Sequence, residues 1–286
     1  MDDVAEDRIP VQHVYDFSRL DRASGGPTSL KIVKSRAAGP VLTGSTLVCT
    51  LGSQPAGTGA KAHADASEQF NYIVQGTMMS DIEADRVFAS KGMILHIPAG
   101  AAHSRLACPD DGLVFLSIRE ARGGIAPASD AKDEGPDAFA GYGSRSGEPR
   151  VTTSDILEQS MKLAPGPGKR YVYDMRKPDD TSPQPASAEV TPDAKLRLPP
   201  RITGKLLSGE RLHVIVLRLE PGASLSNYRK DNEQLVFAAE GELDVDLEEE
   251  HLVLPRRCLL HIPKGTRHEL VAPHGALIVI AQDKGS

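Results

Sequence analysis

The sequence has no tryptophan, few aromatic residues and no long hydrophobic run. Aromatic side chains make up only 4% of the 286 residues, so the cores must be built from Val, Leu, Ile and Ala. No apolar stretch reaches the roughly eighteen residues that a membrane-spanning helix needs. The N-terminal residues lack the positive charge and apolar region of a signal peptide, so we expect a cytoplasmic protein without a membrane partner.

Cysteine is also scarce, and basic runs are missing. Cys49, Cys108 and Cys258 form no CxxC motif and are odd in number. We therefore expect free, buried thiols in a reducing compartment. The net charge is −6 and the isoelectric point is near 5.9, which argues against a nucleic-acid partner and leaves a small molecule as the expected partner.

Proline and glycine, in contrast, are plentiful, with 21 and 26 residues, as a protein with many turns requires. Short β-branched or aliphatic runs between turn residues predict strands, and no sustained i, i+3, i+4 apolar pattern interrupts them in the first half of the chain. The predicted fold class is therefore all-β. The strands predicted in the first half cover 30–33, 46–51, 69–75, 78–84, 86–88, 92–98 and 113–118, with a further strand that carries His63 and Asp65.

The second half of the chain repeats the first. A set of residues lies 165 positions after its counterparts (228 − 63 = 165), and the stretches 95–100 and 260–265 match by eye. Self-similarity at this period indicates two copies of one domain. We expect an N-terminal arm at 1–12, a first domain at 13–120, a linker at 121–170 and a second domain at 171–286. The linker is rich in Gly and Pro, with one helical candidate at 153–163.

Four potential metal ligands gather in the first copy. His63 and Asp65 are two residues apart, so on an extended strand their side chains point to one face. Gln69 follows with the same parity, and a Pro-x-Gly turn at 98–100 then delivers His103. These donors can therefore converge inside a small barrel, which is the arrangement of a metal site.

The spacing of these residues resembles the two motifs of the cupin superfamily. The matching segments read Gly57-x5-His63-x-Asp65-x3-Gln69-x6-Gly76 and Gly92-x5-Pro98-x-Gly100-x2-His103. Two identities depart from the family pattern, because Asp65 stands where a second His is usual and Ala107 replaces an Asn. The resemblance implies a bicupin, with two tandem cupin barrels of the double-stranded β-helix or jelly-roll type. For cupins with a Glu-Gln pair, it also implies that Gln69 is a metal ligand.

The second copy provides an internal control for the ligands. Tyr228 and Lys230 stand where the first copy has His63 and Asp65. A lysine ammonium has no lone pair, and a neutral tyrosine is a poor ligand. We therefore expect the second barrel to have kept the fold and lost the metal, with its site degenerate.

His63, Asp65 and His103 form the two-histidine, one-carboxylate set of non-haem Fe(II) oxygenases, which leaves positions open for O2 and substrate. Asp65 can instead hydrogen-bond a ligating histidine. Gln69 can be a fourth ligand, a substrate contact or a feature of the fold. The same order of ligands occurs in Fe(II)/2-oxoglutarate oxygenases, but only part of the pattern of that group is present. The basic residue that binds the oxoglutarate carboxylate there has no convincing match in this sequence, and Arg119 is a weak candidate for it.

Strand parity predicts the direction in which the neighbouring side chains point. Glu68 has the opposite parity to the ligands and should face away from the site, in a structural role. Asn71 and Ile73 share the parity of the ligands and are expected to line the substrate pocket. His96 recurs in the second copy as His261, which favours a structural role for both.

The mixed nitrogen and oxygen donors favour one divalent transition metal, Fe(II), with Mn, Ni, Co or Zn as alternatives. The absence of a thiolate ligand argues against Cu(I) and against a structural zinc site. The expected function is a metal-dependent dioxygenase, an oxidoreductase acting on a small oxygenated or aromatic metabolite. A non-redox isomerase or lyase, and a non-catalytic binding cupin for sugar-like molecules, stay open.

The resemblance has one further implication, which concerns assembly. Cupins often form homodimers through exchanged N-terminal strands. The segments 8–20 and 171–180 are the candidates for such an exchange in this chain.

Overall fold

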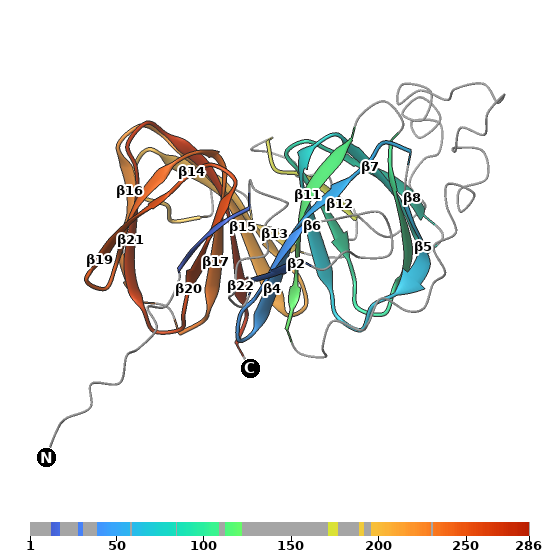
Figure 1. Ribbon diagram of the computed structural model, residues 1–286, viewed down its shortest axis with the longest axis horizontal. Coiled ribbons are helices and arrows are strands. Elements are labelled where there is room, and N and C mark those ends of the chain that lie inside the picture. The colour runs from blue at the N-terminus through green and yellow to red at the C-terminus, as the bar shows by residue number, and fades with distance from the viewer. Residues whose placement is uncertain are drawn as a thin grey trace, which may run out of the picture.

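The computed structural model describes residues 13–17, 28–30, 39–57, 59–83, 85–108, 112–121, 171–176, 189–191, 196–229 and 231–285. All regular elements within these ranges are strands, as the all-β prediction requires (Figure 1). The predicted arm at 1–12 and the helical candidate at 153–163 lie outside them. No helical segment in the described ranges has the length and hydropathy of a membrane span.

The described ranges contain twenty-two strands, which fall into two equivalent sets of eleven. The first copy contains β1 (Val14–Asp16), β2 (Thr28–Leu30), β3 (Pro40–Thr43), β4 (Leu47–Gln54), β5 (Gly59–Ala64), β6 (Gln69–Gln75), β7 (Thr77–Ile82), β8 (Asp85–Ser90), β9 (Met93–Ile97), β10 (Ala102–Ala107) and β11 (Leu113–Glu120). The second contains β12 (Val172–Asp174), β13 (Glu189–Thr191), β14 (Ile202–Ser208), β15 (Leu212–Leu219), β16 (Ala223–Arg229), β17 (Gln234–Gly241), β18 (Leu243–Leu247), β19 (Glu250–Leu254), β20 (Cys258–Ile262), β21 (Arg267–Ala272) and β22 (Ala276–Asp283).

Each half forms a barrel from one seven-stranded and one four-stranded antiparallel sheet. The order is β12-β9-β6-β11-β4-β3-β2 with β5-β10-β7-β8 in the first barrel. The second barrel has β1-β20-β17-β22-β15-β14-β13 with β16-β21-β18-β19, which is the same order of equivalent strands. The two barrels lie side by side, blue to green and orange to red in Figure 1. The repeat in the sequence is therefore a repeat in the structure.

The first strand of each copy belongs to the sheet of the other barrel. β1 pairs with β20, with Val14 opposite Leu260, and β12 pairs with β9, with Val172 opposite Leu95. Within the predicted segments 8–20 and 171–180, the described strands β1 and β12 are thus exchanged inside the chain, between its two barrels. Each barrel needs one strand from the other copy to complete its larger sheet.

The two barrels share one hydrophobic core. Phe70 and Leu116 of the first barrel belong to the same buried cluster as Leu212 and Phe237 of the second. Complete burial of such a side chain contributes about 1.5–3 kcal/mol relative to its exposed state. Each barrel has a further apolar cluster of its own. The shared cluster holds the barrels together and leaves their interiors free to differ.

A buried carboxylate also joins the barrels. Glu68 accepts hydrogen bonds from the backbone N–H groups of residues 210–212 at 2.6–2.8 Å, and its Oε2 lies 3.1 Å from Nε2 of His96. Glu68 therefore faces the second barrel and not the interior of its own. The structural roles expected for Glu68 and His96 are confirmed.

Glu233 makes the same connection in the opposite direction. Its carboxylate accepts hydrogen bonds from the backbone N–H groups of residues 45–47 at 2.7–3.0 Å. Its Oε1 lies 2.7 Å from Nε2 of His261. Since Glu233 and His261 are the repeat counterparts of Glu68 and His96, the two connections are related by the internal symmetry of the chain.

Candidate metal centre

Three of the four predicted ligands, His63, Asp65 and His103, come together at one end of the four-stranded sheet of the first barrel. His63 on β5 is directly opposite His103 on β10, so both side chains lie on the same face. Asp65 follows β5, and its carbonyl oxygen accepts a hydrogen bond of 2.8 Å from the N–H of Gly100. Gly100 has φ +76°, a conformation that glycine adopts without strain, in the turn that precedes β10. The turn thus fixes two ligand-bearing segments against each other.

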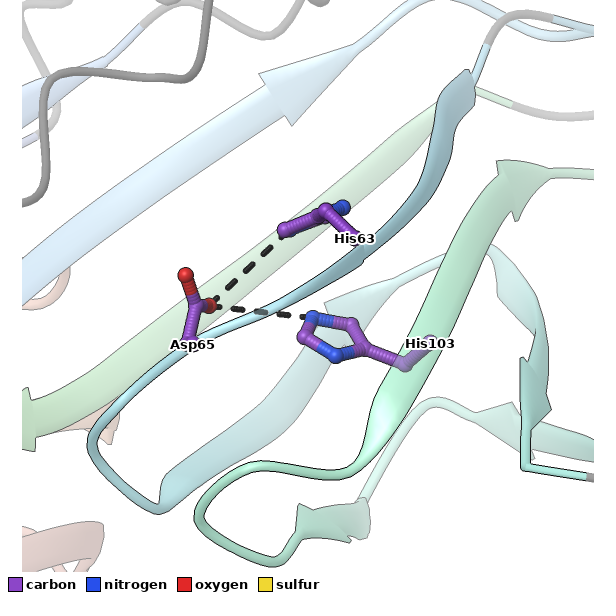
Figure 2. Close-up of side chains that lie close together, drawn as sticks. All are labelled: His63, Asp65 and His103. Atoms are coloured by element: carbon purple, nitrogen blue, oxygen red, sulfur yellow. Dashed lines mark ion pairs between the residues drawn. The ribbon is translucent and has the colours of Figure 1, made fainter.

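The three side chains face a common point. The imidazole centroids of His63 and His103 are 4.3 Å apart. Asp65 Oδ2 lies 3.9 Å from Nε2 of His63 and 3.7 Å from Nε2 of His103. Figure 2 shows the carboxylate turned toward both rings. One donor atom from each residue lies within 4.8 Å of the others, and no other group of His, Cys, Asp or Glu in the described ranges meets this condition.

The local environment fixes the protonation state of His103. Its Nδ1 lies 3.0 Å from the carbonyl oxygen of Ala101, so Nδ1–H donates and the lone pair of Nε2 points toward Asp65. Burial is the largest influence and lowers the pKa of His103 to about 4, with His63 nearby acting in the same direction. The ring is therefore neutral at pH 7, which is the form that binds a metal ion.

Two acceptor atoms at this site make no hydrogen bond. Asp65 Oδ2 and Gln69 Oε1 are buried without a hydrogen-bond partner, although Arg119 Nη1 approaches Asp65 Oδ2 to 3.1 Å as an ion pair. Buried polar atoms are rarely left unsatisfied unless they bind an ion or a water molecule. Two imidazoles and a carboxylate are also ligands that divalent transition metals accept. The residues therefore fit the metal that the sequence predicts.

Gln69 is oriented by its own neighbours. Its Nε2 donates to Oδ1 of Asn71 at 2.6 Å and to Oγ of Ser117 at 2.9 Å. Its Oε1 is thus left as a buried acceptor without a hydrogen-bond partner. Gln69 lies opposite Arg119 across β6 and β11, and Arg119 reaches Asp65. Because directly opposite residues point to the same face of a sheet, Gln69 shares the face from which Arg119 reaches Asp65. Its role as a fourth ligand stays a prediction.

The two predicted pocket residues lie in different surroundings. Asn71 is buried beside Gln69, and its Nδ2 has no hydrogen-bond partner. Ile73 is fully buried in the apolar cluster of the first barrel, together with Met78 and Phe115. Asn71 therefore belongs to the polar part of the barrel interior, and Ile73 belongs to its apolar part. Contact of either residue with a substrate stays a prediction.

Two arginines complete the interior of the first barrel. Arg105 on β10 donates from Nε to Oε1 of Gln54 at 3.1 Å, and its guanidinium lies 4.8 Å above the ring of Phe115. Burial lowers the pKa of Arg105 to about 10 and also lowers the pKa of Arg119. Both side chains remain charged at neutral pH, so the site holds two cations beside one carboxylate.

The cupin-like spacing does not predict Arg105, but the repeat contains a signal for it. The equivalent position in the second barrel is Leu270, which is buried in an apolar cluster. Arg119 likewise corresponds to Gln282, which lies opposite Gln234 as Arg119 lies opposite Gln69. Both arginines thus occur only in the barrel that brings His63, Asp65 and His103 together.

The second barrel differs at the ligand positions. Gln234 donates from Nε2 to Oε1 of Gln282 at 2.9 Å, a pair that replaces the polar contacts around Gln69. The backbone of Tyr228 pairs with that of His268, as His63 pairs with His103. Lys230 lies outside the described residues. The absence of metal from this barrel stays a prediction.

Comparison with known proteins agrees with this architecture. The cupin domain model matches the chain twice, over residues 51–119 and 215–280. No curated protein matches it by sequence.

Several solved structures are similar over most of the chain. A salicylate 1,2-dioxygenase from Pseudaminobacter salicylatoxidans has a TM-score of 0.63 and 17% identity, covering 96% of this chain and 84% of its own. AerE from Microcystis aeruginosa has a TM-score of 0.59 and 10% identity, covering 90% and 97%. Oxalate decarboxylase from Bacillus subtilis, described with Mn(II) centres, has a TM-score of 0.59 and 12% identity, covering 94% and 76%. At these identities the likeness establishes the fold alone.

Proposed function

Because the chain belongs to the cupin superfamily and carries two cupin domains, we propose that its first barrel is a mononuclear metal-dependent dioxygenase. The observation that carries this proposal is the convergence of His63, Asp65 and His103 within 4.8 Å. Two histidines and one carboxylate are the donor set of non-haem Fe(II) oxygenases. Fe(II) is accordingly the favoured metal, with Mn, Ni, Co and Zn as alternatives.

The residues of the site have separate roles in this proposal. His63, Asp65 and His103 would hold the metal, which when bound supplies open coordination positions and redox chemistry for O2. The hydrogen bond to the carbonyl of Ala101 keeps Nε2 of His103 directed at the site. The free Oε1 of Gln69 can accept a hydrogen bond from a substrate hydroxyl, and so orient the substrate.

Arg105 and Arg119 support an anionic substrate. Two guanidinium groups in a largely buried interior carry more positive charge than Asp65 balances, and a carboxylate is the anion that best matches their geometry. The solved structures with the same fold include enzymes named for salicylate and oxalate, which are carboxylates. The substrate that we propose is a small oxygenated or aromatic carboxylate. A homodimer is a further proposal, and it does not require strand exchange between chains, because β1 and β12 are exchanged within the chain.

A second candidate function is a metal-dependent lyase such as a decarboxylase. It is supported by the likeness to oxalate decarboxylase, described with Mn(II) centres, and it uses the same three ligands. There the metal would act as a Lewis acid without oxidation of the substrate. A binding protein without activity is less well supported, because His63, Asp65 and both arginines occur in one copy only.

Oxygen uptake by the Fe(II)-loaded protein tests the proposal against both alternatives. We expect salicylate, gentisate or a related hydroxy-aromatic carboxylate to be consumed together with O2, and the variant His63→Ala to consume none. The matched control is His251→Ala, because His251 is an exposed histidine of the second barrel that pairs with Asp246. Substrate loss at an equal rate without O2 would refute the dioxygenase and favour the lyase.

A further inference from the structure

A cavity of about 460 Å³ lies between the two barrels and shares no residue with the metal centre. Its lining includes Tyr72 from the first barrel, Arg176 beside β12, and Lys205 and Arg218 from the second barrel. Tyr72 lies between Asn71 and Ile73 on β6, so its side chain leaves the strand on the face opposite to theirs. The volume is within the range of about 300–1,000 Å³ that is usual for small-molecule sites.

The cavity has an excess of positive charge. Lys205 is only 3% exposed, and its Nζ donates to the backbone oxygen of Asp174 at 2.9 Å. Arg176 forms a bidentate ion pair with the carboxylate of Asp174. Arg218 is exposed and has no ion-pair partner among the described residues. The lining thus contains three cations and no carboxylate. Asp174, which is not part of the lining, pairs with Arg176, and the nearby Glu240 is paired with Lys91.

Lys205 and Arg218 lie on one face of the sheet. Thr203 is opposite Arg218 and Lys205 is opposite Val216 across β14 and β15, with the pair Gly204 and Leu217 between them. Lys205 and Arg218 are therefore diagonal neighbours on the same face. Lys205 is at the buried end of the cavity, and Arg218 is at its exposed end. An anion that enters from solvent can therefore contact both.

The internal repeat shows that the fold does not require these charges. The counterparts of Lys205 and Arg218 in the first barrel are Pro40 and Ser53, at the same positions of the equivalent strands. A buried lysine costs free energy unless its charge is compensated. Lys205 and Arg218 therefore have a role that is specific to their side of the pseudosymmetric interface.

The remaining lining supplies one hydroxyl and an apolar wall. Burial raises the pKa of Tyr72 to about 12, so its hydroxyl is protonated at neutral pH. That hydroxyl has no hydrogen-bond partner within the described part of the chain and is available as a donor. Met175, Val216 and Leu277 form the apolar part of the lining. The cavity combines donors for an anionic group with a surface for an apolar body.

We propose that this cavity is a second ligand site, which binds a small organic carboxylate between the barrels. The carboxylate lies between Lys205 and Arg218 and accepts a hydrogen bond from Tyr72, and its apolar body packs on Met175 and Leu277. Because these residues come from both barrels, the ligand stabilises their association as well as the folded chain. The site is independent of the metal centre and of the reaction proposed for it.

Calorimetric titration of the full chain with 2-naphthoate tests the proposal. We expect saturable binding, and about tenfold weaker binding by Arg218→Gln, because a charge-assisted hydrogen bond is lost. Arg256→Gln, which removes an exposed arginine away from the cavity, should bind as the wild type does. Neutral 2-naphthamide should bind at least tenfold more weakly by the same argument, about as weakly as the Arg218→Gln variant binds the acid.

Each of the other outcomes contradicts the proposal. Absence of saturable binding, equal binding of the acid and the amide, or equal binding by Arg218→Gln and wild type would each overturn it. Loss of binding in His63→Ala with retention in Arg218→Gln would place the anion at the metal centre instead. Arg218 is exposed, so its variant should fold, and thermal unfolding without ligand checks this. Lys205→Met is a second variant, expected to bind 2-naphthoate as weakly as Arg218→Gln.

Discussion

Arg119 Nη1 lies 3.1 Å from Asp65 Oδ2, the carboxylate oxygen that also faces the Nε2 atoms of His63 and His103. A guanidinium and a divalent cation would therefore approach the same oxygen. Their charges repel, and burial strengthens this repulsion because the surroundings screen it less than water does. The first barrel thus places a fixed cation where it opposes the metal and can attract an anionic substrate.

Substitution of Arg119 by Gln should separate these two effects. We expect Arg119→Gln to bind Mn(II) about three- to tenfold more tightly, because one repulsive charge is removed from beside Asp65. Gln is the residue that the second barrel has at the equivalent position, Gln282, so it is compatible with the fold. Competition with a chelator measures the affinity. Unchanged or weaker metal binding would show that Arg119 does not oppose the metal.

The contribution of Glu233 to stability should depend on pH. Burial by itself would raise the pKa of Glu233, but hydrogen bonds from His261, Ser45 and Thr46 outweigh it and lower the pKa to about 2. A carboxyl group whose pKa is lowered by folding stabilises the protein above its unfolded pKa, near 4.3. This stabilisation is lost as the pH falls through the folded pKa.

We therefore expect Glu233→Gln to be less stable than the wild type by on the order of 3 kcal/mol at pH 6. The difference should shrink between about pH 5 and pH 2, as the wild-type carboxylate becomes protonated. Urea unfolding at a series of pH values measures it, with the exposed Glu249→Gln as control. A difference that stays constant across this range would contradict the assigned interaction.

Gly209 should not tolerate a side chain, because it faces the carboxylate that joins the barrels. A Cβ at Gly209 would lie 2.3 Å from Oε2 of Glu68 and 2.6 Å from Cζ of Phe70, both of which are buried. We expect Gly209→Ala to lose about 1–3 kcal/mol, as overpacked sites do. Gly112→Ala is the control, since its nearest atom is 3.7 Å away. Equal melting temperatures of the two variants would contradict the packing described.

The sequence predicts some strands closely and misses others for a physical reason. The prediction at 69–75 coincides with β6, where apolar and β-branched residues are bounded by Gly76. β10, at Ala102–Ala107, is not among the predicted strands. Its side chains include His103 and Arg105, which point into the barrel toward the site. A strand that lines a polar site loses the alternation on which prediction depends.

The convergence of His63, Asp65 and His103 could be predicted because short spacings and one turn determine their positions. Arg105 has the strand parity of His103, but the family motifs do not include it and arginine is usually exposed, so only the comparison with Leu270 in the second copy distinguishes it. Strand exchange is equally invisible in the sequence, because β1 and β12 share the tripeptide Val-Tyr-Asp. Either segment could complete either sheet by its local sequence.

Metal content measured beside the His63→Ala variant tests the central claim most directly. Protein purified without oxygen should contain about one divalent transition metal ion per chain, as one competent site requires, and His63→Ala should contain far less. His251→Ala should retain the wild-type content, because His251 is exposed in the second barrel. Equal metal in wild type and His63→Ala, or none in either, would contradict a metal centre formed by His63, Asp65 and His103.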